Sequence, residues 1–192
     1  MKGDKLFIFS APSGAGKTSI VRGVLREVPG LAFSVSACSR ERRPGEQDGV
    51  DYYFMSPEGF REKIGQDAFL EWEEVYPGSY YGTLRSEVER LWGEGFHVVF
   101  DVDVAGGLKI KEQYPDQALS LFIRPPSLEV LKERLVNRQT ESEESLKKRL
   151  GKAEQELSAA RFFDHVIVND RLDEAISEAV RMVKGFIARD KA

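Results

Sequence analysis

Apolar residues along the chain follow two spacings, and together these predict alternating strands and helices. Short runs with little polar interruption predict β-strands at 6–9, 33–36, 97–104, 119–123 and 165–168. The longer of these runs are almost continuously apolar, which is typical of strands covered on both faces in a parallel sheet. Apolar side chains three and four residues apart predict helices over 18–28, 127–138, 143–161 and 173–188. The alternation indicates an α/β fold.

The middle of the chain differs from the rest. Residues 34–94 contain short β-like pieces, brief helical patterns at 57–64 and 84–92, and many carboxylates and aromatic side chains. We therefore expect one domain in three parts: a core of residues 1–33, 95–125 and 163–192, an inserted lobe of 34–94, and a helical lid of 126–162. The stretch NRQTESEES, at 137–145, has no apolar residue and is expected to form a mobile loop tip.

Composition narrows the function classes. A chain of 192 residues fits one domain, and 28 Lys and Arg against 32 Asp and Glu give a net charge of -4, which argues against broad nucleic-acid or anionic-membrane binding. Cys38 is the single cysteine, so an intrachain disulfide and a zinc site of several thiolates are excluded. With no signal-peptide pattern and no membrane-spanning apolar run, we expect a cytoplasmic protein. The sequence favours neither a monomer nor a homo-oligomer.

A phosphate-binding loop is predicted directly after the first strand. The small residues of 11–18, APSGAGKT, lead into a helix and match G-x-x-x-x-G-K-[ST] except at Ala11, which must keep φ negative to replace glycine. In such loops, backbone N–H groups surround phosphates at a helix N-terminus, the lysine reaches the outer phosphates and the hydroxyl binds Mg²⁺. The candidate ATP-binding residues here are Ala11, Pro12, Ser13, Gly14, Ala15, Gly16, Lys17, Thr18 and Ser19.

Acidic residues end one of the predicted strands. Asp101 follows the apolar run at 98–100, and in this it resembles the strand-end aspartate that helps to hold Mg²⁺ in phosphate-loop proteins. We expect Thr18 and Asp101 to form the metal site, with Asp101 acting through a bound water. We expect Asp103 to lie on the same strand face as Asp101, because strand side chains alternate with period two.

Two groups of arginines suggest two anionic substrates. Arg40 and Arg43 lie in the inserted lobe, and Arg134, Arg138 and Arg149 flank the polar tip of the lid. Transfer of a phosphoryl group between two phosphates requires neutralisation of crowded negative charge, and a planar, always charged guanidinium does this well. Any one of these arginines, taken alone, is better explained as a solvated surface residue. Their combination with the phosphate loop favours phosphoryl transfer.

Several stretches closely resemble bacterial-type guanylate kinases. They include SAPSGAGKTS at 10–19, FSVSACSRERRPGEQDGVDYYF at 33–54, FLEWEEVYPGSYYGT at 69–83, VVFDVDVAGG at 98–107 and RQTESEESLKKRL at 138–150. The resemblance extends over nearly the whole chain. It implies a P-loop NTPase-type parallel sheet core flanked by helices, with an inserted mixed α+β GMP-binding lobe and a helical lid. It also implies transfer of the ATP γ-phosphate to GMP, and to dGMP, with Mg²⁺, in purine nucleotide metabolism and GMP recycling.

The resemblance also implies roles for single residues. The GMP phosphate would be held by Arg40, Arg43, Tyr52 and Tyr81, and guanine by Ser36, Glu71 and Thr83, with Asp103 nearby. Lys17, Arg43, Arg138 and Arg149 would be catalytic, and Arg134 and Asn169 would complete the ATP site. The chemistry of Glu71 agrees, because guanine offers N1–H and an exocyclic amine as donors to a carboxylate, whereas the N1 acceptor of adenine would leave that carboxylate unpaired.

Two other functions stay in competition. Guanylate kinase-like domains of scaffold proteins bind phosphopeptides without turning over nucleotide, but they typically have a degraded ATP site, whereas Lys17, Thr18 and Asp101 are all present here. A kinase for another nucleoside monophosphate is the second alternative. ATP turnover distinguishes the enzyme from the scaffold, and the selectivity of a Glu71→Gln variant distinguishes the kinases.

Overall fold

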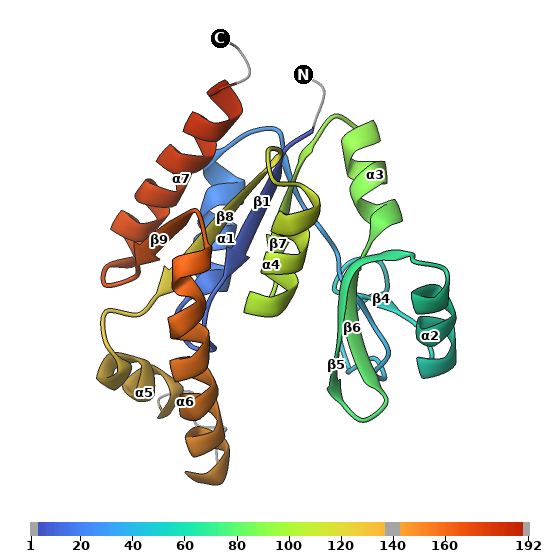
Figure 1. Cartoon of the computed structure of the whole chain (residues 1–192), viewed down its shortest axis with the longest axis horizontal. Helices are drawn as coiled ribbons and strands as arrows, with labels where there is room; N and C mark the ends of the chain where they lie inside the picture. Colours follow the sequence, from blue (N-terminus) through green and yellow to red (C-terminus); the bar gives the residue numbers. More distant parts are fainter. Residues whose placement is uncertain (1–3, 137–142, 190–192) are drawn as a thin grey trace.

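The computed structural model describes residues 4–136 and 143–189, apart from the side chains of 143–148. A five-stranded parallel sheet with the strand order β2-β7-β1-β8-β9 forms the centre of the molecule (Figure 1). The predicted α/β class is therefore confirmed. The strands are β1 (Leu6–Ser10), β2 (Leu31–Phe33), β7 (His97–Asp101), β8 (Ala118–Arg124) and β9 (His165–Val168).

Helices cover both faces of this sheet, which explains its unbroken apolar strands. Phe7 and Phe9 of β1 pack with α1 (Lys17–Glu27) and α7 (Leu172–Ala188), whereas Leu6 and Ile8 pack on the opposite face with α3 (Arg85–Gly93) and α4 (Val104–Gln113). All four side chains are 0% exposed. Burying each such side chain contributes about 1.5–3 kcal/mol, so the pattern along β1 stabilises both layers at once.

A second, mixed sheet lies within residues 34–94. Its strand order is β4-β3-β6-β5, and Phe60 of α2 stacks on Phe69 with 4.3 Å between the ring centroids. Ser56 caps α2 by accepting a hydrogen bond from the Gly59 N–H group. The elements are β3 (Ala37–Cys38), β4 (Tyr53–Phe54), α2 (Pro57–Gly65), β5 (Phe69–Tyr76) and β6 (Ser79–Leu84).

The predicted lid region is helical where the structure describes it. It contains α5 (Leu128–Val136), α6 (Glu143–Ser158) and the short 3₁₀-helix η1 (Ala159–Phe162), and α5 and α6 pack through a small apolar cluster of Leu131, Leu135 and Ala153. In Figure 1 these helices lie on one side of the molecule and the second sheet lies on the other. Residues 137–142, which include Arg138 and most of the predicted mobile tip, lie outside the described residues.

One predicted strand is too long. The run 97–104 was expected to be extended throughout, but β7 ends at Asp101, and Asp103 is the N-cap of α4, where it accepts a 2.7 Å hydrogen bond from the Gly106 N–H group. The period-two argument that placed Asp101 and Asp103 on one strand face is therefore wrong. The pattern missed α4 because two adjacent glycines lower its helix propensity, whereas the aspartate cap favours it. The strand expected at 33–36 instead spans Leu31–Phe33, so the prediction is wrong except at Phe33.

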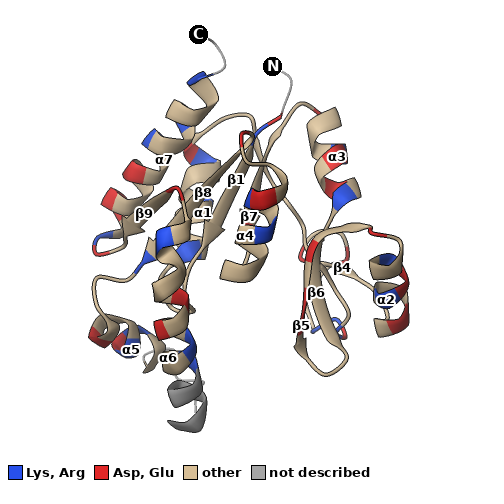
Figure 2. Ribbon diagram, viewed as in Figure 1, with Lys and Arg blue, Asp and Glu red and all other residues tan. Residues whose placement is uncertain are grey.

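Charged side chains lie mainly on helices and loops. Figure 2 shows the central strands almost entirely without Lys, Arg, Asp or Glu along their length. No helix among the described residues is long and apolar enough to cross a bilayer.

Candidate functional site

The predicted phosphate-binding loop joins β1 to α1 and lines a cavity of about 350 Å³. Gly16, the N-cap of α1, has φ 94°, and a Cβ atom there would overlap the side-chain amide of Asn169. In the described part of the chain, Asp67 is the single non-glycine residue with positive φ, so Ala11 keeps the negative φ that the sequence requires. The cavity lining comprises Ala11, Pro12, Ser13, Gly14, Gly16, Lys17, Thr18, Ser19, Asp103, Lys152 and Glu156.

Lys17, Thr18 and Asp101 lie together at the carboxyl end of β7. The Nζ atom of Lys17 is 2.7 Å from Oδ1 of Asp101 and donates a 2.6 Å hydrogen bond to the Val102 carbonyl. The Thr18 hydroxyl donates a 2.9 Å hydrogen bond to the other carboxylate oxygen, Oδ2. The structure thus brings the predicted metal pair, Thr18 and Asp101, into direct contact.

Residues of the predicted lid region and of the β9–α7 turn lie near the same loop. Arg149 of α6 donates a 3.2 Å hydrogen bond to the Ser13 hydroxyl, and the Asn169 side chain donates a 2.7 Å bond to the Ala15 carbonyl. Arg134 of α5 donates a 2.9 Å bond to the Asn169 carbonyl. Arg149 and Asn169 therefore contact the phosphate loop directly, and Arg134 is joined to it through Asn169.

The sequence reasoning missed two further residues of this cavity, Lys152 and Glu156. Both lie on α6, three and seven residues after Arg149, and these spacings place them on the same helical face. Helical spacing from Arg149 was the signal that could have found them. Burial raises the pKa of Glu156 above its ordinary value, and nearby Lys152 opposes only part of this rise.

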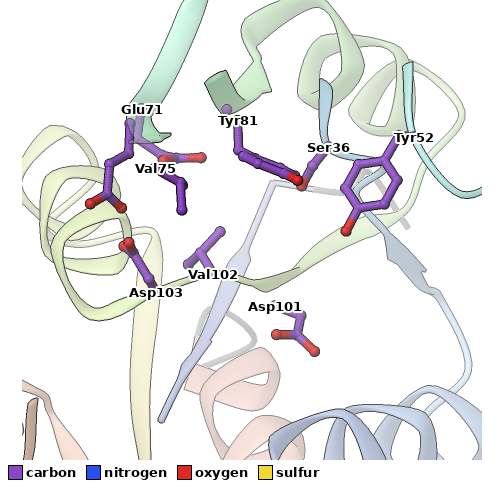
Figure 3. A pocket seen from close by; sticks show the side chains of 10 residues that line it. Ser36, Tyr52, Glu71, Val75, Tyr81, Asp101, Val102 and Asp103 are labelled. Atoms are coloured by element: carbon purple, nitrogen blue, oxygen red, sulfur yellow. The ribbon is translucent and has the colours of Figure 1, made fainter. Parts of the chain in front are cut away.

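A second cavity, of about 280 Å³, lies between the two sheets. Figure 3 shows Glu71 and Asp103 on one side of it with their carboxylates near each other, and Ser36, Tyr52 and Tyr81 on the other side. Asp103 lines both cavities, so the two meet at its side chain. The lining comprises Ser36, Tyr52, Glu71, Glu73, Val75, Tyr81, Gly82, Asp101, Val102 and Asp103.

Glu71 is fixed against Thr83 and the start of α4. Its Oε1 atom accepts a 2.7 Å hydrogen bond from the Thr83 hydroxyl, across the pairing of β5 with β6. A Cβ atom on Gly106 would lie 2.7 Å from Glu71 Oε2, so a larger residue there would displace this carboxylate. Burial raises the pKa of Glu71, and the hydrogen bond from Thr83 partly opposes that rise. Two of the residues predicted to bind guanine, Glu71 and Thr83, are thus joined by a direct hydrogen bond.

Glu73 is a cavity residue that the sequence reasoning missed. It lies two residues after Glu71 on β5, and the period of two was the signal that could have found it. A hydrogen bond with Asp103 and burial raise the pKa of Glu73 to about 7. Burial pushes the pKa of Asp103 upward as well, but hydrogen bonds from Glu73 and the Gly106 N–H group hold it below its ordinary value.

Arg40 is engaged by a carboxylate that the sequence did not single out. Its guanidinium forms a bidentate pair with Glu46 at 2.7 and 2.6 Å, and it lies over the Tyr52 ring at 5.0 Å from the centroid. Hydrogen bonds from Arg40 and from the Arg43 N–H group lower the pKa of Glu46 to about 2. Tyr52 and Tyr81 are edge to face, with 6.0 Å between centroids. The Arg43 residue is exposed and lines neither cavity.

Comparison with known proteins agrees with this geometry. Residues 3–185 match the family model described as guanylate kinase. The chain belongs to the guanylate kinase family. It is 49% identical to the guanylate kinase of Bacteroides fragilis over 97% of this chain and 91% of that one. It is also 50% identical to the guanylate kinase of Salinibacter ruber, over 95% of this chain and 97% of that one.

Solved structures give the same result for this guanylate kinase family member. The crystal structure of guanylate kinase from Anaplasma phagocytophilum is similar with a TM-score of 0.75 and 27% identity, covering 96% of this chain and 87% of that one. Shikimate kinase from Bacteroides thetaiotaomicron has a TM-score of 0.52 at 14% identity, over 95% of this chain and 98% of that one, which shows a shared fold alone. The predicted family and the predicted P-loop fold are confirmed.

Proposed function

We propose that this protein transfers the γ-phosphate of ATP to GMP, giving ADP and GDP. One observation carries the proposal: the phosphate-loop cavity and the cavity with the Glu71–Thr83 pair meet at Asp103. Direct transfer between two nucleotides requires such adjacent sites, since donor and acceptor phosphates must approach in line. The ATP phosphates would lie at the loop and GMP between the two sheets.

On the donor side, Lys17 and Arg149 would bind the ATP phosphates, with Arg134 and Asn169 beside them. Thr18 and Asp101 offer a hydroxyl and a carboxylate, the hard oxygen donors that suit Mg²⁺, and Mg²⁺ in kinases is commonly held by one or two protein groups together with phosphate oxygens. No group of three or more His, Cys, Asp or Glu in the described part of the chain could hold a metal. Bound Mg²⁺ would neutralise the charge on the transferring phosphates, with Asp101 acting through a water.

On the acceptor side, Glu71, Thr83, Ser36 and Asp103 would bind guanine, while Arg40, Arg43, Tyr52 and Tyr81 would bind its phosphate. The buried Glu71 carboxylate matches the N1–H and amine donors of guanine. The attacking oxygen of GMP is already ionised near neutral pH, so this scheme needs no general base. We also expect dGMP to be an acceptor, since the proposed contacts use the base and the phosphate.

We further propose that residues 34–94 are a GMP-binding lobe and 126–162 a lid, both closing on the core to exclude water. The expected location is the cytoplasm, in purine nucleotide metabolism. The 3.2 Å contact of Arg149 with Ser13 supports the lid, because it already connects α6 to the phosphate loop.

The competing functions make different predictions. A phosphopeptide-binding module would have no use for the Lys17, Thr18 and Asp101 cluster, and a kinase for AMP would leave the buried Glu71 carboxylate facing an acceptor. Both observations favour a guanylate kinase.

The test is turnover. Purified protein with ATP and Mg²⁺ is incubated separately with GMP, dGMP, AMP, CMP or UMP, and the diphosphates are quantified by chromatography. We expect rapid GDP formation, almost no product from AMP, and no activity in a Lys17→Ala variant. Binding of GMP without phosphorylation of any nucleotide would exclude the kinase and favour the binding module.

A further inference from the structure

A buried carboxylate lies behind the second cavity and lines neither cavity. Glu87, in the first turn of α3, is 3% exposed, although glutamate is almost never fully buried unless paired. Its position is where the chain returns from the second sheet to the core, because β6 ends at Leu84 and α3 begins at Arg85. A charge in such a place requires specific partners.

Four donors from three segments satisfy this carboxylate. Oε2 accepts a 2.8 Å hydrogen bond from the Tyr53 hydroxyl and a 3.0 Å bond from Nε of Arg90. Oε1 accepts a 3.0 Å bond from the Arg90 guanidinium and a longer one, 3.4 Å, from the Val35 N–H group. Tyr53 belongs to β4 and Val35 to the outward connection between β2 and β3. Glu87 therefore links the segment that leads from the central sheet to the second sheet with the helix by which the chain returns to the central sheet.

The residues bound by Glu87 are neighbours of cavity residues. Val35 precedes Ser36, and Tyr53 follows Tyr52, and both Ser36 and Tyr52 line the second cavity. The Tyr53 N–H group also donates a 2.9 Å hydrogen bond to the Ser36 carbonyl. One carboxylate thus restrains the backbone at two places where the chain presents side chains to the cavity.

We propose that Glu87 is a positioning residue for the nucleoside monophosphate: it holds Ser36 and Tyr52 in place from behind and does not touch the substrate. The inference rests on the proposed function, since it assumes that GMP occupies the second cavity. Both carboxylate oxygens act only as acceptors here, whereas a glutamine side chain would turn an NH₂ group toward at least one donor. Glu87→Gln therefore keeps the shape of the side chain but breaks the network on one side.

The first experiment compares Glu87→Gln with Glu89→Gln, which removes a charge from an exposed position of the same helix. The loss of one charged hydrogen bond is expected to raise the KM for GMP about tenfold in Glu87→Gln. The KM for ATP and kcat are expected to stay within about twofold, because Glu87 contacts no part of the phosphate loop in the network described above. Glu89→Gln is expected to behave as wild type. A parallel rise of both KM values, or an unchanged KM for GMP with a lowered Tm, would overturn the proposal.

Tyr53→Phe gives an independent test that leaves the Glu87–Arg90 pair intact. It is expected to raise the KM for GMP about threefold alone and by less than threefold in the Glu87→Gln background, because both changes act on the same hydrogen-bond network. If Glu87→Gln does not fold, an unchanged KM for GMP in Tyr53→Phe overturns the proposal. Calorimetric titration with GMP alone, without ATP, measures the same effects. If the wild type binds GMP without turnover, the proposed kinase function fails, while these affinities still decide the role of Glu87.

Discussion

The Nζ atom of Lys17 lies 2.7 Å from Oδ1 of Asp101 and connects the first turn of α1 to the carboxyl end of β7. The side chains of both residues are less than a fifth exposed, at 17% and 18%. The second oxygen of Asp101 accepts the Thr18 hydroxyl at 2.9 Å. The proposed phosphate-binding lysine and both proposed Mg²⁺ residues are therefore coupled, and a change in one alters the surroundings of the others.

Lys17→Ala is expected to lower kcat by about 10³-fold or more, because a group that neutralises phosphate charge in the transition state is lost. GMP affinity is expected to stay within about threefold, since the Glu71 side of the second cavity is untouched. Steady-state kinetics and calorimetry measure the two effects, with Lys184→Ala on the exposed surface of α7 as the control. A Lys17→Ala enzyme with near-normal turnover would remove the phosphate loop from the proposed site.

Glu71→Gln is expected to lower kcat/KM for GMP by about 10–10²-fold, the usual effect of losing a hydrogen bond to a buried charged group. The glutamine amide would present a donor to guanine donors, and the same change relaxes discrimination against AMP. Competition assays with GMP and AMP measure the ratio. Glu74→Gln on the same strand, whose side chain accepts from the Gly78 N–H group outside the cavity, is the matched control. Unchanged selectivity in Glu71→Gln would show that guanine is bound elsewhere.

Arg149→Ala is expected to lower kcat by about 10³-fold, within the range found for transition-state arginines in phosphoryl transfer. Arg149→Lys is expected to retain only part of the wild-type kcat, because lysine lacks the planar guanidinium group. Thermal unfolding should change little in either variant. The same loss of turnover is expected for Arg43→Ala and Arg138→Ala. An Arg149→Ala enzyme that retains its kcat would show that the contact with Ser13 has no catalytic role.

The sequence could predict elements whose signals are local. The strand at 6–9 is apolar on both faces, and the loop at 11–18 combines small residues with Lys17 and Thr18, so both were found where the structure has them. The sequence pattern does not predict a helix over 104–113, since its glycines suppress the propensity signal. Gly107 packs closely against β1, because a Cβ there would lie 2.6 Å from the Ser10 hydroxyl. Tertiary packing therefore outweighs the low helix propensity of residues 104–113.

Residues that act through distant partners were harder to predict. Glu46 pairs with Arg40 six residues away through a loop conformation that no periodicity specifies. Glu87 depends on Tyr53, which lies 34 positions earlier in the chain. Glu73 lies on the same strand face as Glu71, but its raised pKa depends on Asp103. Asp103 lies at the N-terminus of α4, where the sequence predicts that β7 continues, so the sequence could not predict this contact.

The pairing of Glu73 with Asp103 gives the protein a pH-dependent stability. In the unfolded chain, Glu73 titrates near its ordinary value of 4.5, whereas the hydrogen bond with Asp103 and burial raise its pKa to about 7 in the folded protein. Lys109 and Lys152 face the same carboxyl and oppose this rise, but they do not cancel it. Between these two pH values the folded protein binds more protons than the unfolded chain, so the free energy of unfolding falls as pH rises.

The contribution of Glu73 is fully present below pH 4.5 and is lost as pH rises through about 7, whereas that of Asp103, with its lowered pKa, is lost only in acid. We expect the Tm of the wild type to fall from pH 5 to pH 8 by more than that of Glu73→Gln, whose amide can donate to Asp103 at every pH. Glu74→Gln, which leaves Glu73 and Asp103 in place, should follow the wild-type curve. Thermal unfolding of the three proteins across this range measures the difference. Parallel curves for wild type and Glu73→Gln would show that Glu73 and Asp103 do not share a proton.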